Sequence, residues 1–248
     1  MRRLEGVLKA AVLAGLAWML YSTISDGTLT YYTNAHFAWL PFVAMMLLAA
    51  LAMTLVYRLQ LIRGAREQGN TPEGDNKAGR LWWGGVAIMA IPVVLGLMVP
   101  ARPPGVSVIG IRGISLSAPV RPAAEQSTNR AAGAPKNVLD WLREFGTNSD
   151  PSVYIGQTVD VTGFIYRDSH NGSDQFWVSR FAISCCVADA TAIGMLAQSP
   201  QAPSLQVGNW VRVTGQLGVG KYAGQTVPVI HADQITSADQ PANPYLNP

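Results

Sequence analysis

The chain has 248 residues, of which 49% are hydrophobic and only 13% are charged, and its formal net charge is +3. Because a typical soluble domain is about 25% charged, this composition indicates that much of the surface faces lipid. The few basic residues form no stripe, which argues against a nucleic-acid partner. The apolar residues crowd into residues 1–100, whereas the remainder resembles an ordinary soluble domain.

Three apolar stretches, at residues 7–24, 37–57 and 81–99, predict membrane-spanning helices. A bilayer core of about 30 Å needs about 20 helical residues, and each stretch is long enough. Pro41 is expected in the first turns of the second helix, where a missing N–H is tolerated. Pro92 and Gly96 in the third stretch suggest a helix-packing surface, the alternative being ordinary lipid-facing sequence. The alternatives are buried helices of a soluble protein and, for the first stretch, a signal peptide.

The basic residues predict the orientation of these helices. Lys and Arg precede the first stretch and fill the loop at residues 58–80, whereas the loop at residues 25–35 contains neither. The positive-inside rule then places the N-terminus in the cytoplasm. Three spans would leave everything after residue 99 outside. We therefore expect a multi-pass protein of the plasma membrane with an extracytoplasmic C-terminal domain.

Residues 101–136 are rich in Pro, Ala, Gly and Ser and predict an extended linker. Within this range, residues 106–116 alternate enough to predict a short strand. An amphipathic pattern then predicts a helix over residues 137–145, with Asn137 as the N-cap and Gly146 as the C-cap.

Five alternating segments follow and predict β-strands separated by Gly-rich turns. They cover residues 158–166, 176–187, 192–197, 210–217 and 226–235. Five short strands and one helix predict that residues 137–248 form a compact OB-like barrel. The fold class is therefore an α-helical membrane region followed by a small, mostly β domain.

An ordered set of short motifs resembles one bacterial family. The motifs are Gly163-Phe-Ile-Tyr-Arg-Asp, Ser179-Arg-Phe-Ala-Ile-Ser-Cys-Cys-Val-Ala-Asp-Ala, Trp210-Val-Arg-Val-Thr-Gly, Pro228-Val-Ile and Pro244-Tyr-Leu. Together they resemble the C-terminal domain of a family of permease-subunit membrane proteins, whose Bacillus members are encoded beside a permease of the arsenical-permease type. The resemblance implies an architecture and a multi-span permease partner rather than a reaction.

Cys185 and Cys186 are adjacent, which excludes a disulfide framework. On a strand, neighbouring side chains point to opposite faces, so one of them would be core and the other would face a groove or solvent. Both cysteines can be small buried residues. Alternatively they bind a thiophilic ion such as Zn, Cu(I) or trivalent arsenic, with Asp189 and, more weakly, His170 as further ligands. That site requires the strand to bulge or end at the cysteines. A strained ring disulfide is the third interpretation.

Arg180 is predicted to be a barrel-rim arginine that pairs with Asp160 or Asp168, or alternatively with an acidic partner. Phe176, Trp177 and Tyr166 are predicted to pack in the core rather than to form a base-stacking platform.

No catalytic grouping of Ser, His and Asp and no phosphate-binding glycine loop is recognisable, so we expect no enzyme and no cofactor other than a thiophilic metal ion. The apolar stretches contain too few polar groups for a complete transporter. The sequence therefore predicts an accessory subunit of a two-part membrane permease whose outer domain binds or gates a metal or metalloid ion. The alternatives are a membrane-anchored interaction module with structural cysteines and a thiol redox enzyme.

Overall fold

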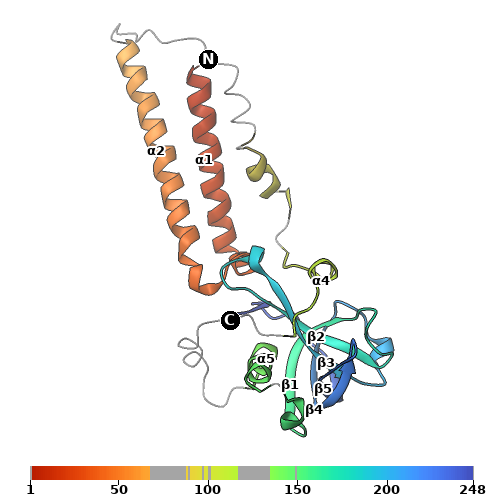
Figure 1. Ribbon diagram of the computed structural model, residues 1–248. Helices are drawn as coiled ribbons and strands as arrows, with labels where there is room; N and C mark the ends of the chain where they lie inside the picture. Colours follow the sequence, from red (N-terminus) through yellow and green to blue (C-terminus); the bar gives the residue numbers. More distant parts are fainter. Residues whose placement is uncertain are drawn as a thin grey trace. The chain divides into compact units, whose positions relative to one another are not determined.

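The computed structural model describes residues 2–67, 88, 90–96, 98–99, 102–116, 135–148 and 150–247 (Figure 1). The chain divides into two units, of which the first comprises Met1–Thr30 and Ala35–Arg102 and the second Tyr31–Asn34 and Pro103–Pro248. Most of the predicted linker and half of the third predicted span lie outside the described residues. The described part of that span is helical at residues 88, 90–96 and 98.

The first unit contains two long apolar helices, α1 (Arg2–Ser25) and α2 (Trp39–Glu67). Their apolar stretches, Gly6–Ser25 and Ala35–Leu61, have mean hydropathies of 1.6 and 2.2 and are almost entirely unburied. By length and composition both can cross a bilayer, and both match the predicted spans. Pro41 lies in the first turn of α2, as predicted, where its ring disturbs no helical hydrogen bond.

Glycines allow close contact between the helices of the first unit. A Cβ atom on Gly6 of α1 would lie 2.6 Å from a methyl group of Leu59 of α2. Gly96 faces Met19 of α1 so closely that a Cβ atom would overlap its sulfur. This confirms that Gly96 belongs to a helix-packing surface, because small residues allow helices in lipid to approach one another.

The second unit is built on five strands that close into a ring. They are β1 (Thr158–Tyr166), β2 (Gln175–Ala182), β3 (Thr191–Gln198), β4 (Trp210–Tyr222) and β5 (Gln225–Ser237). The strand order is β1-β4-β5-β3-β2, and pairing of β1 with β2 closes the ring. The β3–β5 pair is parallel and the other ring pairs are antiparallel. This near-barrel confirms the predicted OB-like fold.

Two glycines allow strands of the ring to approach closely. A Cβ atom on Gly163 would lie 2.5 Å from the carbonyl oxygen of Ser179, and one on Gly215 would overlap the carbonyl oxygen of His231. Both glycines follow the Val-x-Val-Thr pattern of an alternating strand, and Gly215 also lies at a bulge in the β4–β5 pairing. Phe176 belongs to the main apolar cluster inside the ring, whereas Trp177, its neighbour on β2, is buried in a separate cluster on the opposite face of the strand. Both are packed in apolar clusters, as predicted.

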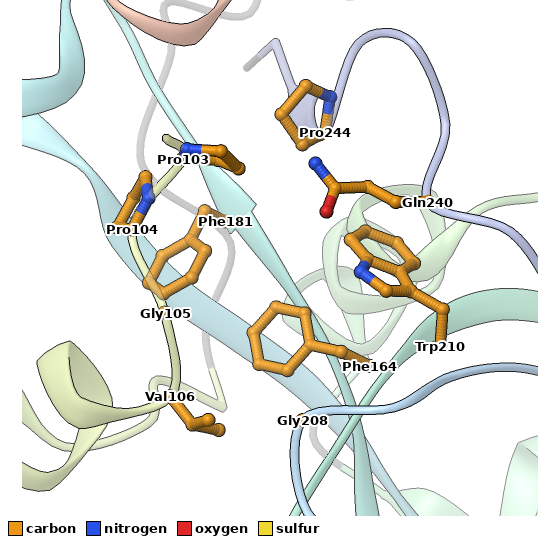
Figure 2. A pocket seen from close by; sticks show the side chains of 10 residues that line it. All are labelled: Pro103, Pro104, Gly105, Val106, Phe164, Phe181, Gly208, Trp210, Gln240 and Pro244. Carbon is orange, nitrogen blue, oxygen red and sulfur yellow. The ribbon is translucent and has the colours of Figure 1, made fainter. Parts of the chain in front are cut away.

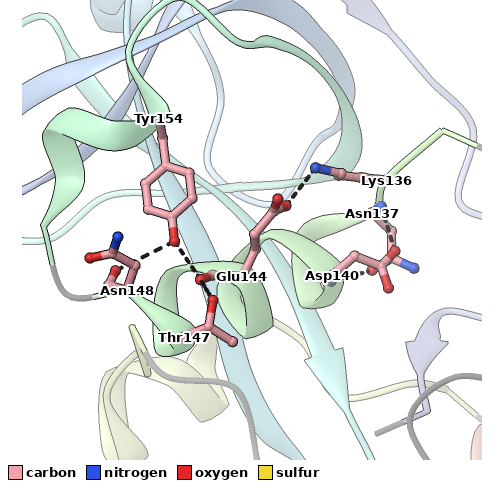
Figure 3. A network of polar contacts seen from close by, with 7 residues as sticks. All are labelled: Lys136, Asn137, Asp140, Glu144, Thr147, Asn148 and Tyr154. Atoms are coloured by element: carbon pink, nitrogen blue, oxygen red, sulfur yellow. Dashed lines mark hydrogen bonds and ion pairs between the residues drawn. The ribbon is translucent and has the colours of Figure 1, made fainter.

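Helix α5 (Val138–Thr147) packs against β1, β2 and β3. The predicted N-cap fixes the start of this helix. The Asn137 side chain accepts hydrogen bonds from the amides of Leu139 (2.9 Å) and Asp140 (3.1 Å). The Asp140 carboxylate in turn accepts a hydrogen bond from the Asn137 amide (Figure 3). The predicted C-cap is wrong, because the helix continues through Gly146 and ends at Asn148.

Two strand predictions are wrong: one predicted strand contains a helix, and another ends earlier than predicted. Residues 106–116 contain a short helix, α4 (Ser107–Arg112), which buries Ile109 against Phe164 and Phe181. Only Ser115 forms a bridge, with Ile193 of β3. The second strand ends at Ala182 rather than at residue 187, because the amides of Ser184 and Cys185 donate to the carboxylate of Asp189 instead of to a neighbouring strand.

Arg180 of β2 is buried, with 7% of its surface exposed. Its guanidinium donates to the carbonyl oxygens of Pro244 (3.2 Å), Asn243 (3.2 Å) and Thr162 (3.5 Å) and lies 5.0 Å from the centre of the Trp210 ring. Burial lowers the pKa of Arg180 to about 10, which still leaves the group charged at neutral pH. The buried cation is therefore stabilised by peptide dipoles and an aromatic face.

The predicted pairing of Arg180 with Asp160 or Asp168 is wrong. Asp160 pairs with Arg212 across the β1–β4 ladder, with Nε 2.7 Å from the carboxylate. Asp168 accepts a hydrogen bond from the hydroxyl of Tyr222. No pattern in the sequence indicates that the segment preceding residue 245 returns to β2. Nor does any pattern indicate that its carbonyl groups accept hydrogen bonds from Arg180.

The same segment forms β6 (Tyr245–Leu246), which pairs in parallel with β2. Here the amide of Ile183 donates to the carbonyl of Leu246 at 3.1 Å. Arg180 and β6 therefore attach the chain beyond Ser237 to the end of β2.

We expect Arg180→Met to loosen this attachment, because Met fills the apolar space but cannot donate to the three carbonyl groups. Removing hydrogen bonds from a charged donor costs about 1.5–3 kcal/mol. Hydrogen exchange of the Ile183 amide in the full-length protein should accelerate accordingly. Arg212→Met, which breaks an exposed ion pair that contributes little to stability, is the matched control. Equal exchange in the two variants would contradict the role of Arg180.

Candidate functional site

The two cysteines lie in the turn between β2 and β3, which we call the cysteine turn (residues 183–190). Cys185 is exposed, Cys186 is partly exposed, and both are free thiols. The prediction that one cysteine belongs to the core is wrong, because the strand ends before it reaches them. The two Sγ atoms are 3.6 Å apart. The geometric condition for a paired thiol site, a strand that ends at the cysteines, is therefore met.

Asp189 holds the shape of this turn. Its carboxylate accepts hydrogen bonds from the amides of Cys185 (2.7 Å) and Ser184 (3.0 Å). Partial burial opposes ionisation of Asp189, but its hydrogen bonds with Cys185, Ser184 and Cys186 outweigh this and lower the pKa of the carboxyl. Asp189 thus lies beside the thiols, as predicted, with its oxygens directed at the backbone.

The same carboxylate controls the protonation of the neighbouring thiol. A hydrogen bond to Asp189, followed by the contact with Cys186, raises the pKa of Cys185 to about 11. At neutral pH Cys185 therefore carries a proton, and a metal ion has to displace it in order to bind.

The separation of the sulfurs favours a chelated ion over a disulfide. Two thiolates bound to one tetrahedral zinc ion at 2.3 Å lie about 3.8 Å apart. A disulfide would instead require the 3.6 Å separation of Cys185 and Cys186 to shrink to about 2.05 Å. The turn thus fits a bidentate thiophilic ion with little rearrangement. No group of three or more His, Cys, Asp or Glu side chains suited to a metal occurs among the residues that the structure describes.

His170 and Asp168 are not brought together with the cysteines. They lie in the turn between β1 and β2, whereas the cysteine turn follows the other end of β2. The amide of His170 donates to Asp168 at 2.8 Å, and the His170 ring packs against Tyr222, with 5.9 Å between ring centres. These residues form a separate polar cluster with Tyr222.

Sequence analysis missed the segment that pairs with the cysteine turn. Residues Tyr31–Asn34, which lie between α1 and α2 in the sequence, belong to the barrel unit. Thr33 forms an antiparallel bridge with Cys186, and the Asn34 amide donates to the carbonyl of Cys185 at 3.1 Å. No local pattern in such a short loop indicates pairing with a turn so far along the chain.

A second candidate site is a small aromatic pocket of about 140 Å³ in the barrel unit (Figure 2). Phe164 stacks on Phe181, with 5.3 Å between ring centres, and meets Trp210 edge-on. The remaining walls come from residues 103–106, Gly208, Gln240 and Pro244. Because these walls come from segments outside the five strands, no sequence pattern indicates this pocket.

Comparisons with known proteins agree with this architecture. The protein from Bacillus subtilis named UPF0703 protein YcgQ is 24% identical, and the match covers 97% of this chain and 99% of the relative. A protein of Streptococcus mutans named "Putative two-component membrane permease complex subunit" is 25% identical over 97% of this chain and 98% of the relative.

Among solved structures, a small single-stranded DNA-binding protein from Streptomyces coelicolor matches 34% of this chain and 94% of its own, with 17% identity and a TM-score of 0.21. Two family models match nearly consecutive parts of the chain: the DUF1980 N-terminal domain at residues 8–115 and the DUF1980 C-terminal domain at residues 126–248. The chain therefore belongs to the DUF1980 family and contains both of its domains.

Proposed function

We propose that this protein is the accessory subunit of a two-part membrane permease, and that its barrel binds or gates a thiophilic metal or metalloid ion at Cys185 and Cys186. The observation that carries the ion site is the exposed pair of sulfurs 3.6 Å apart. Two thiolates leave further coordination positions to water or to a partner, which suits an ion that is passed on rather than stored. The name of the Streptococcus mutans relative supports the permease role.

The apolar helices support a partner within the bilayer. Large apolar side chains such as Met46 and Met53 of α2 and Trp18 of α1 are exposed in the single chain. Lipid or another membrane protein is therefore expected to cover them. Because a transport path normally carries polar groups, these helices are better suited to docking on a multi-span permease than to forming a path themselves. We propose no enzymatic activity.

The contact between Tyr31–Asn34 and the cysteine turn supports an extracytoplasmic barrel. The loop between α1 and α2 contains no Lys or Arg, so the positive-inside rule favours the outer side for it. The pairing of the cysteine turn with this loop supports the same side of the membrane for the barrel. The chain must then cross the bilayer once more after α2, which supports residues 81–99 as the third span.

The second candidate function is a membrane-anchored interaction module. The pocket formed by Phe164, Phe181 and Trp210 favours it, because an aromatic recess can receive a side chain of a protein or a group of an envelope polymer. In that case the cysteines would be structural, and their replacement would leave function intact.

The proposed topology predicts that a membrane-impermeant maleimide added to intact spheroplasts labels the cysteine turn, more slowly at Cys185 because its raised pKa leaves little reactive thiolate. The barrel would be outside, and Cys185 is exposed there. The double variant Cys185→Ser/Cys186→Ser controls for background labelling, and labelling of lysed cells defines the maximum extent of labelling. Labelling only after lysis would place the barrel in the cytoplasm and contradict the topology.

The permease role predicts that tagged full-length protein, solubilised in mild detergent, co-purifies with a multi-span membrane protein. The exposed apolar helices supply the docking surface. A tagged control protein in which unrelated membrane-spanning helices precede the same barrel should therefore lose the partner. Absence of any permease, together with unchanged metal sensitivity of a deletion strain, would refute the role.

The ion site predicts that full-length protein in detergent binds about one thiophilic ion, measured by elemental analysis after dialysis against Zn²⁺, and that Cys185→Ser/Cys186→Ser abolishes binding. Affinity should rise about tenfold per pH unit for each thiol proton released. For Cys185 this dependence should persist up to about pH 11, because its pKa is raised. Equal metal content in wild type and double variant would refute the site.

A further inference from the structure

The loop between α1 and α2 contributes one segment, Tyr31–Asn34, to the barrel unit; we call it the interhelical segment. It pairs with the cysteine turn through the backbone. The Asn34 amide donates to the Cys185 carbonyl at 3.1 Å, and the Val187 amide donates to the Tyr32 carbonyl at 2.9 Å. Between these bonds lies the Thr33–Cys186 bridge. The backbone around Cys185 and Cys186 is thus hydrogen-bonded to this segment in the manner of an antiparallel strand pair.

Asn34 adds side-chain contacts to this pairing. Its Nδ2 donates to the carbonyl oxygens of Ser184 (2.9 Å) and Ile183 (3.2 Å), and only 7% of the residue is exposed. With its backbone amide, Asn34 therefore donates to three successive carbonyl groups. The Asp189 carboxylate accepts from the amides of Ser184 and Cys185. The peptide groups that position the two sulfurs are consequently held by both residues.

A second anchor fixes the other end of the interhelical segment. The hydroxyl of Tyr245, a buried residue of β6, donates to the carbonyl of Tyr31 at 2.8 Å. Since β6 pairs with β2 immediately before the cysteine turn, the segment and the turn are attached to the same end of the same strand. A shift of the turn therefore acts directly on the segment.

We propose that ion occupancy of Cys185 and Cys186 is thermodynamically coupled to docking of the interhelical segment, with Asn34 as the positioning residue. This inference rests on the proposed ion site. Each sulfur is separated from the backbone by a single methylene group, so the separation of the sulfurs follows the shape of the turn. Docking of Asn34 keeps the two sulfurs near the separation that is needed to chelate one ion. Ion binding then does not have to order the turn, which would cost conformational entropy.

Coupling between two events is reciprocal. If docking of Asn34 strengthens ion binding by some factor, the ion strengthens docking by the same factor. The interhelical segment lies in the loop between Ser25, the end of α1, and Trp39, the start of α2. Ion occupancy in the barrel is thereby transmitted to the connection between the two apolar helices, where a permease partner can sense it.

The test measures Zn²⁺ affinity of the full-length protein in detergent by competition with a fluorescent chelator. We expect Asn34→Ala to weaken binding about tenfold, which lies within the usual range of coupling between sites. Asn34→Asp should weaken it further, because a carboxylate would face the carbonyl oxygens of Ile183 and Ser184. Thr30→Ala, in the same loop but bonded only locally to Gly27, should bind as wild type does.

The reciprocal measurement uses the wild-type protein and is therefore independent of any folding defect in a variant. Zn²⁺ should slow hydrogen exchange of the Asn34 and Val187 amides by a factor similar to the affinity lost in Asn34→Ala. Unchanged affinity in Asn34→Ala, or exchange that Zn²⁺ does not slow, would overturn the coupling while the ion site stands. Failure of the wild type to bind Zn²⁺ would instead refute the ion site and the coupling together.

Discussion

The end of β2 at Ala182 is the constraint on which the rest of the barrel unit depends. Beyond this residue the backbone amides of Ser184 and Cys185 donate to Asp189, and the carbonyl groups of residues 183–185 accept from Asn34. Because these polar groups are satisfied inside the turn, the ladder with β3 does not extend to them. The two cysteines consequently leave the barrel wall and come together, instead of pointing to opposite faces of a strand.

The barrel could be predicted because its signals are local. Alternation in the strands and the cap at Asn137 are contained within short windows of sequence, and the strands begin close to their predicted positions. The fourth strand is the exception at its end, because it runs through Gly218 and Gly220 to Tyr222 instead of turning after residue 217. The errors lie where distant groups decide the conformation. Residues 176–187 are rich in β-forming side chains, yet Asn34 and Asp189 end the strand early. Residues 107–112 form a helix that buries Ile109 in an apolar cluster with Phe164 and Phe181, a tertiary contact that alternation alone cannot reveal.

The candidate site divides in the same way. The adjacent cysteines and Asp189 were visible as a short motif, and the structure brings them together. Arg180 was expected to need a carboxylate, but peptide carbonyl groups of residues 243 and 244 satisfy it instead. Such carbonyl groups exist in every residue, so no sequence pattern distinguishes the two that Arg180 uses. The interhelical segment was hidden for a similar reason, since most of its contacts are made by the backbone and by one asparagine.

The attachment of β6 has a consequence for how the protein is made. Two of the three carbonyl groups that accept from the Arg180 guanidinium belong to Asn243 and Pro244, which are synthesised after every strand of the ring. During biogenesis the ring can assemble first, but its buried cation waits without those ligands until residues 243–246 have emerged. The barrel is therefore complete only once residues 243–246 have joined the end of β2.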